Sequence, residues 1–123
     1  MNNPFNILNK NTGTPITDEP TAADLAARIK NIIDSSDLVL FMKGIPDAPQ
    51  CGFSANVVAI LNHLKVEFKT FDILSDMDIR QGVKEFSNWP TYPQLYFKSK
   101  LVGGNDIITE MYESGDLQQV INS

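Results

Sequence analysis

The sequence predicts an α/β domain in which a mixed four-stranded sheet carries helices on both faces. Residues 38–42 (LVLFM) are apolar throughout, which is typical of a central strand that is buried on both faces. Apolar residues at helical spacing precede and follow this strand, and a second strand-like segment comes after them. Two short apolar runs on either side of residues 98–100 predict a hairpin. A strand–helix–strand unit followed by a hairpin combines parallel and antiparallel pairing in one sheet.

The N-terminal part is expected to contain one helix. Residues 1–20 are rich in Asn, Thr and Pro and have no periodicity, so we predict a flexible extension there and a folded domain over residues 21–123. Thr21 and Asp24 have the spacing of a capping box at a helix N-terminus. The helix that follows has one apolar face, made of Leu25, Ile29, Ile32 and Ile33.

The middle of the chain is expected to contain a loop, a helix, a strand and a further helix. Residues 43–50 contain one Gly and two Pro and are predicted to form the loop. Cys51 then begins a helix with apolar residues at Val57, Val58, Ile60, Leu61 and Leu64. Alternating polarity predicts a strand over residues 66–73, and apolar spacing predicts a helix over residues 76–86.

The C-terminal third is expected to contain the hairpin and a last helix. Residues 89–93 cannot be helical, because each proline restricts the residue before it to extended backbone. Residues 94–97 and 101–102 are the two predicted strands of the hairpin. Residues 103–106 (GGND) form a turn, and a helix over residues 107–121 is expected to be interrupted near Gly115.

The composition limits the classes of function. A formal charge of −5 and only two arginines, Arg28 and Arg80, disfavour binding to nucleic acid. The apolar runs fall far short of the ~20 residues that span a bilayer, so no membrane-spanning segment is predicted. The first twenty residues have neither the apolar stretch of a secretory signal nor the Arg-rich pattern of a transit peptide. We therefore expect a cytoplasmic protein.

Cys51 is the one cysteine of the chain, which excludes an internal disulfide, a CxxC pair and a four-thiolate zinc site within one chain. A free cysteine is often a small buried apolar residue. The position of Cys51 favours a reactive thiolate instead, because polar Gln50 and Gly52 flank it and a helix begins there. Unpaired N–H groups at a helix N-terminus stabilise a thiolate and lower the pKa of the thiol.

For the other candidate residues, a structural or solvated role is an alternative to a functional one. Lys43 follows the central strand, where ligands of α/β sheets bind, but a solvated surface lysine is the simpler alternative. Arg80 is by itself a solvated charge. Asp106 is either the N-cap of the last helix or, with Gly103 and Gly104, part of a binding site for the charged end of a ligand. His63 is expected to be a surface residue without a role.

Four motifs in register resemble the monothiol glutaredoxins of the CGFS type. They are residues 43–44 (KG), 51–54 (CGFS), 89–93 (WPTYP) and 103–106 (GGND), and the likeness runs from about Thr21 to the C-terminus. The resemblance implies a thioredoxin-like fold, in agreement with the predicted order of elements. It also implies a cis peptide bond before Pro93.

The resemblance implies roles for particular residues. Cys51 would be the thiolate that binds the sulfur of glutathione or an iron atom. Lys43 and Arg80 would pair with the glycine carboxylate of glutathione, and the backbone of Tyr92 would contact its cysteinyl part. The γ-glutamyl end would be held by Asn105 and Asp106, with the Asp106 carboxylate accepting from the ammonium group.

Two departures from related sequences accompany these roles. Residues 52–54 (GFS) replace the Pro-Tyr-Cys of dithiol relatives, so a resolving thiol is absent. Asn105 stands where many members of the family have Cys or another small residue.

The preferred function is binding and transfer of an iron–sulfur cluster. A 2Fe–2S cluster commonly takes four thiolates. Two chains supply two cysteines, and two bound glutathione molecules complete the set, so we expect a homodimer that exists because of its cluster. Members of this type also pair with BolA-like proteins and deliver clusters to apo iron–sulfur proteins, which are the partners expected here.

The alternative is a glutathione-dependent thiol–disulfide oxidoreductase. One cysteine is sufficient, because Cys51 would attack the glutathionyl sulfur of a mixed disulfide and a second glutathione would resolve the product. In the CGFS type, a loop such as residues 45–50 is associated with weak oxidoreductase activity and with cluster delivery, which favours the carrier. A thioredoxin-like binding module with an inert Cys51 is a third possibility.

Overall fold

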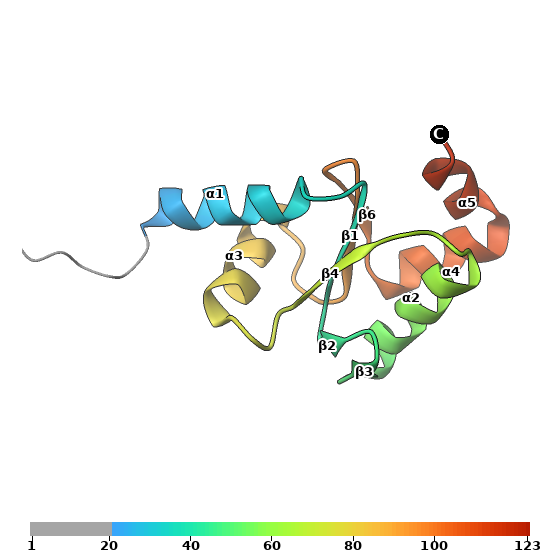
Figure 1. Cartoon of the computed structure of the whole chain (residues 1–123), viewed down its shortest axis with the longest axis horizontal. Helices are drawn as coiled ribbons and strands as arrows, with labels where there is room; N and C mark the ends of the chain where they lie inside the picture. Colours follow the sequence, from blue (N-terminus) through green and yellow to red (C-terminus); the bar gives the residue numbers. More distant parts are fainter. Residues whose placement is uncertain (1–20) are drawn as a thin grey trace, which may run out of the picture.

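The computed structural model describes residues 21–123, and the predicted extension over residues 1–20 lies outside the described residues. Apart from two short strands before Cys51, the helices and strands follow in the expected order (Figure 1). They are α1 (Ala22–Ile33), β1 (Leu38–Met42), β2 (Gly44–Ile45), β3 (Ala48–Pro49), α2 (Gly52–His63), β4 (Lys69–Asp72), α3 (Met77–Ser87), β5 (Gln94–Phe97), β6 (Lys100–Gly103), α4 (Asn105–Ser114) and α5 (Asp116–Ile121). Within residues 21–123, no helix has the length and apolar character that a bilayer span requires.

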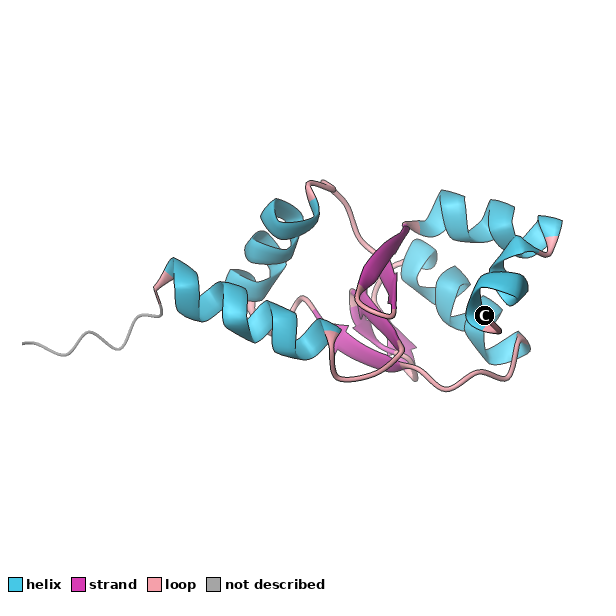
Figure 2. Ribbon diagram, turned by 90° about the horizontal axis from the view of Figure 1, so that it is seen from above, coloured by secondary structure: helices cyan, strands magenta, loops and turns pink. Residues whose placement is uncertain are grey.

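The main sheet has four strands in the order β4-β1-β5-β6. β1 pairs parallel with β4 and antiparallel with β5, and β6 closes the hairpin with β5. The mixed sheet that the sequence predicted is therefore confirmed. Figure 2 shows the sheet between two groups of helices.

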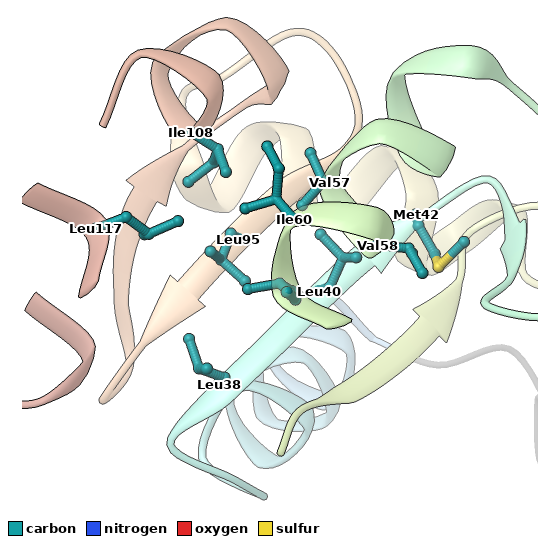
Figure 3. Packing of buried hydrophobic residues seen from close by; sticks show 10 residues of the cluster. Leu38, Leu40, Met42, Val57, Val58, Ile60, Leu95, Ile108 and Leu117 are labelled. Atoms are coloured by element: carbon teal, nitrogen blue, oxygen red, sulfur yellow. The ribbon is translucent and has the colours of Figure 1, made fainter. Parts of the chain in front are cut away.

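Each face of the sheet has its own core, and β1 contributes to both. Leu38, Leu40 and Met42 point to the side covered by α2, α4 and α5 (Figure 3), whereas Val39 and Phe41 point to the side of α1 and α3. All five β1 residues are buried, which explains why the strand has no polar position. α3 and α4 consequently pack against opposite faces of one sheet.

The N-termini of α1, α2 and α3 agree with the sequence signals. The Thr21 side chain accepts from the Asp24 N–H at 3.1 Å, and the Asp24 carboxylate accepts from the Thr21 N–H at 3.2 Å, so the predicted capping box is formed. Asp76 caps α3 by accepting from the Ile79 N–H at 3.1 Å. Cys51 is the N-cap of α2.

The segment before Cys51 differs from the prediction. Residues 43–50 were expected to be a plain loop, but β2 and β3 form a small antiparallel hairpin there. Gly44 makes this turn back possible with a φ of +92°, and the Gln50 N–H closes the loop by donating to the Lys43 carbonyl at 2.8 Å. Strands of two residues have no periodicity to detect, so the sequence pattern could not predict them.

Two further boundaries were placed incorrectly. The strand predicted over residues 66–73 is limited to β4, because β4 is an edge strand that pairs only along β1. The last helix begins at Asn105 rather than at residue 107, and its N-cap is Gly104. The suggestion that Asp106 caps this helix is therefore wrong. The expected interruption at Gly115 is confirmed, with a φ of +85°.

Candidate functional site

Cys51 lies where the β2–β3 hairpin meets the first turn of α2. Its backbone is extended, with φ −156° and ψ 151°, and its sulfur accepts from the Ser54 N–H at 3.4 Å. The residue is partly exposed, so the sulfur is open to a reaction partner while its other side faces the helix. This is the predicted position at a helix N-terminus.

Ser54 connects the thiol to the end of β1. Its side chain is fully buried, accepts from the Lys43 N–H at 3.1 Å and lies with its oxygen 3.6 Å from the Cys51 sulfur. The Lys43 N–H occupies one lone pair of the Ser54 oxygen, and the hydroxyl proton is left to donate to the thiolate when Cys51 is ionised. A backbone donor, a hydroxyl and a sulfur thus form one chain of contacts.

These contacts lower the pKa of Cys51. Partial burial of the sulfur is the largest single influence and opposes ionisation. Hydrogen bonds from the Ser54 N–H and hydroxyl, then the Phe53 N–H and the charge of Lys43, together outweigh it, so the pKa lies below its ordinary value. The reactive-thiolate interpretation has this physical support.

A cavity of about 420 Å³ opens beside this region. It is lined by Lys43, Phe53, Arg80, Lys84, Trp89, Pro90, Thr91, Tyr92, Gly104, Asn105, Asp106 and Ile107. Besides Cys51, five residues were predicted to contact glutathione, and all five are among them. Cys51 does not line the cavity itself, but its neighbours Lys43 and Phe53 do. A volume in this range is typical of small-molecule sites.

The charges around the cavity come from three elements. Lys43 follows β1, Arg80 and Lys84 lie one turn apart on α3, and Asp106 is in the first turn of α4. Because α3 and α4 cover opposite faces of the sheet, the cavity has cations on the α3 side and a carboxylate on the α4 side. Such a site matches a ligand with an anionic and a cationic end.

The cavity wall between α3 and β5 is formed by residues 89–92, and a buried side-chain amide fixes its backbone. The Gln94 side chain is fully buried and donates to the carbonyls of Trp89 at 3.1 Å and Thr91 at 3.2 Å, and Tyr96 donates to its oxygen at 3.1 Å. A methyl group at Gly104 would lie 3.3 Å from Trp89 Nε1 and 3.3 Å from the Pro93 carbonyl oxygen, so the backbone packs closely against the indole here.

Tyr92 is buried in this wall, and its hydroxyl donates to the Arg80 carbonyl at 2.6 Å. Burial raises the pKa of the phenol well above its ordinary value, so Tyr92 serves as a neutral donor. The Tyr92–Pro93 peptide bond is cis, as the family resemblance implied.

Comparison with known proteins identifies the family. Residues 38–102 match the family model for glutaredoxin. A Synechocystis protein named uncharacterized monothiol glutaredoxin ycf64-like is 52% identical over 95 residues, which are 77% of this chain and 89% of the relative. The chain belongs to the monothiol glutaredoxin family.

Longer relatives and solved structures agree with this assignment. Monothiol glutaredoxin-S17 of Arabidopsis thaliana is 54% identical over 107 residues, which are 87% of this chain and 21% of the relative, so this glutaredoxin spans about a fifth of that protein. The solution structure of reduced poplar apo GrxS14 superposes with a TM-score of 0.73 at 46% identity, covering 81% of this chain and 92% of that one. The thioredoxin-like fold is thereby confirmed.

Sequence reasoning missed several lining residues of this glutaredoxin. Lys84 lies four residues after Arg80, and helical spacing alone could have placed both on one face of α3. Phe53 is 62% exposed at the edge of the cavity, a position that its place in the CGFS motif does not reveal. His63 lies in the last turn of α2 with its ring 5.8 Å from Tyr112 and does not line the cavity.

Proposed function

We propose that this glutaredoxin carries a 2Fe–2S cluster as cargo, bound by the Cys51 thiolate and one glutathione thiolate from each of two chains. The supporting observation is a partly exposed Cys51 with a lowered pKa next to a cavity lined by charged side chains. Within residues 21–123 there is no group of three or more His, Cys, Asp or Glu side chains that could hold a metal ion. A cluster that takes four thiolates therefore needs ligands from outside the chain.

The surroundings of Cys51 fit a ligand to iron. Iron binds the thiolate, and the hydrogen bonds from Ser54 and Phe53 favour that form. The sulfur is partly exposed at the start of α2, so it is accessible to a cluster at the protein surface. When bound, the cluster is the group that is passed on, while this chain supplies one sulfur and the glutathione site.

The cavity fits glutathione by charge. Lys43, Arg80 and Asp106 line the cavity. In this proposal the two cations pair with the glycine carboxylate, and Asp106 pairs with the γ-glutamyl ammonium. Lys84 adds a third cation next to Arg80, on the α3 side of the cavity. In the same proposal the backbone of Tyr92 binds the cysteinyl part, and Asn105 assists Asp106 at the γ-glutamyl end.

The thiolate count supports a homodimer, and the likeness to monothiol glutaredoxins of the CGFS type suggests the other partners of this proposal. A homodimer forms around the cluster, and apo iron–sulfur proteins receive it. A BolA-like protein is a further proposed partner in place of the second copy. Cytoplasmic location is part of the same proposal.

A second candidate function is removal of glutathione from mixed disulfides, and the lowered pKa of Cys51 favours it. The Cys51 thiolate attacks the glutathionyl sulfur of a protein–glutathione disulfide and releases the protein thiolate. A second glutathione thiolate then attacks the Cys51-bound glutathionyl sulfur, which gives oxidised glutathione and restores the Cys51 thiolate. No second cysteine is needed.

Anaerobic reconstitution with ferrous iron, sulfide and glutathione tests the carrier function. We expect a brown dimer by visible absorption and size exclusion, which does not form without glutathione or in Cys51→Ser. Lys43→Gln should raise the glutathione concentration required, whereas Lys100→Gln, at an exposed lysine outside the cavity, should not. A colourless monomer that turns over a glutathionylated peptide would replace the carrier function by the second candidate.

A further inference from the structure

A network of polar side chains bridges α2 and α4 next to the cavity. Asn56 Nδ2 donates to Asn105 Oδ1 at 2.8 Å and to Thr109 Oγ1 at 2.9 Å. Asn105 Nδ2 in turn donates to Asp106 Oδ1 at 3.2 Å. Asn56 is therefore two hydrogen bonds away from the carboxylate that faces the cavity.

The donors and acceptors of this network fix its direction. The Thr109 hydroxyl has one proton and donates it to the backbone carbonyl of Asn105 at 2.8 Å, so the hydroxyl can only accept from Asn56. Asn56 must then present its NH₂ group to both partners. Asn105 consequently presents its oxygen to Asn56, and its own NH₂ group is left for Asp106. Each amide orientation follows from the one before it.

We propose that Asn56 is a positioning residue that orients the Asp106 carboxylate for the ammonium group of a γ-glutamyl ligand. This inference rests on the proposed binding of glutathione. Asp106 is exposed, and an exposed side chain loses rotamer freedom when it binds a ligand. A donor already held against Oδ1 reduces that loss and leaves the second carboxylate oxygen for the ligand.

Asn56 acts only through its neighbours. Asn105 and Asp106 line the cavity, whereas Asn56 does not. A change at position 56 therefore removes no direct contact with a ligand in the cavity. If the network only held α2 and α4 together, its loss would lower the affinity of the cavity for every ligand by the same factor.

Two ligands separate these roles. S-methylglutathione cannot form a disulfide with Cys51, and its analogue with a glutaryl group in place of the γ-glutamyl group keeps the carboxylate but has no ammonium. Trp89 is the one tryptophan of the chain and lines the cavity, so its fluorescence reports the binding of either ligand. The matched control for Asn56→Ala is Asn62→Ala, at another exposed asparagine of α2 that does not line the cavity.

We expect Asn56→Ala to lower the affinity for S-methylglutathione about three- to tenfold, which is the effect of ordering one side chain. The affinity for the glutaryl analogue should not change. The loss should disappear when Asn56→Ala is made in an Asp106→Ala background. Equal weakening of both ligands, or no change in either, would overturn the positioning role. A wild-type chain that binds neither ligand would instead contradict the proposed glutathione site, and the inference with it.

Discussion

Ser54→Ala separates the two tasks of the serine beside the active thiol. The hydroxyl accepts from the Lys43 N–H at 3.1 Å and lies 3.6 Å from the Cys51 sulfur. Alanine keeps the backbone N–H that donates to the sulfur and is a good helix former in the first turn of α2. Only the contributions of the hydroxyl are removed.

The stability cost follows from the lost acceptor. Ser54 is fully buried, so no water replaces its oxygen at the Lys43 N–H without rearrangement. A buried donor left without a partner costs about 1–3 kcal/mol, and the partial exposure of Lys43 favours the lower half, about 1–2 kcal/mol. For a domain of this size, that lowers Tm by about 4–8 °C. The pKa of Cys51 should rise, because the thiolate loses one of its donors.

Thermal unfolding and alkylation measure the two effects independently. Tm is followed by circular dichroism, and the rate of reaction with iodoacetamide as a function of pH reports the thiolate. Ser35→Ala, at a hydroxyl that donates to the Ile32 carbonyl in the turn after α1, is the control and should change neither quantity appreciably. An alkylation profile of Ser54→Ala that coincides with the wild-type profile would refute the role of the hydroxyl in stabilising the thiolate.

Two substitutions elsewhere test the framework of the site. Gly44→Ala places a methyl group 2.6 Å from the Ala48 carbonyl oxygen at a φ of +92°, and should cost about 1–3 kcal/mol in chemical denaturation, whereas Gly52→Ala, with open space around it, should cost less than half as much. Asp76→Ala removes the N-cap of α3 and the 3.1 Å ion pair with Arg28, and should cost about 1 kcal/mol at neutral pH. The Ile79 N–H and Arg28 hold the pKa of Asp76 below its ordinary value of 3.8, so this stability is complete above that value and lost as the pH falls through the folded-state pKa. Wild type and variant should therefore converge in acid, and a difference that persists there would contradict the assignment.

Local signals predicted the elements best where one segment decides its own structure. The apolar run of β1 identified the central strand, because a strand buried on both faces has no polar position. The capping box at Thr21 and the glycine at position 115 correctly marked helix boundaries, because each signal acts within its own turn of the chain. Boundaries that depend on a partner were less accurate. The extent of β4 is set by the length of β1 beside it, which its own sequence does not contain.

The site was only partly accessible to sequence reasoning. The position of Cys51 at a helix start follows from its own surroundings, but nothing in the sequence pattern brings Arg80 and Asp106 to one cavity. The expectation that both contact one ligand came from the family motifs. The topology brings both residues to one cavity, since α3 and α4 pack on opposite faces of the sheet and both contribute to the cavity lining. The link from Asn56 to Asn105 joins residues 49 positions apart and has no signature in sequence.

Activation of the thiol and binding of the ligand are therefore largely separate properties of the fold. The thiolate is stabilised chiefly from within the first turn of α2, whereas most of the charged side chains that line the cavity come from α3 and α4. Lys43 is the exception, because it lines the cavity and its charge also lowers the pKa of Cys51. Lys43→Gln should thus lower the affinity for S-methylglutathione and also raise the pKa of the Cys51 thiol. Arg80→Gln should lower only the affinity for S-methylglutathione. If the alkylation profiles of both variants shifted to higher pH, Arg80 would also affect the pKa of Cys51, and the separation of the two properties would be refuted.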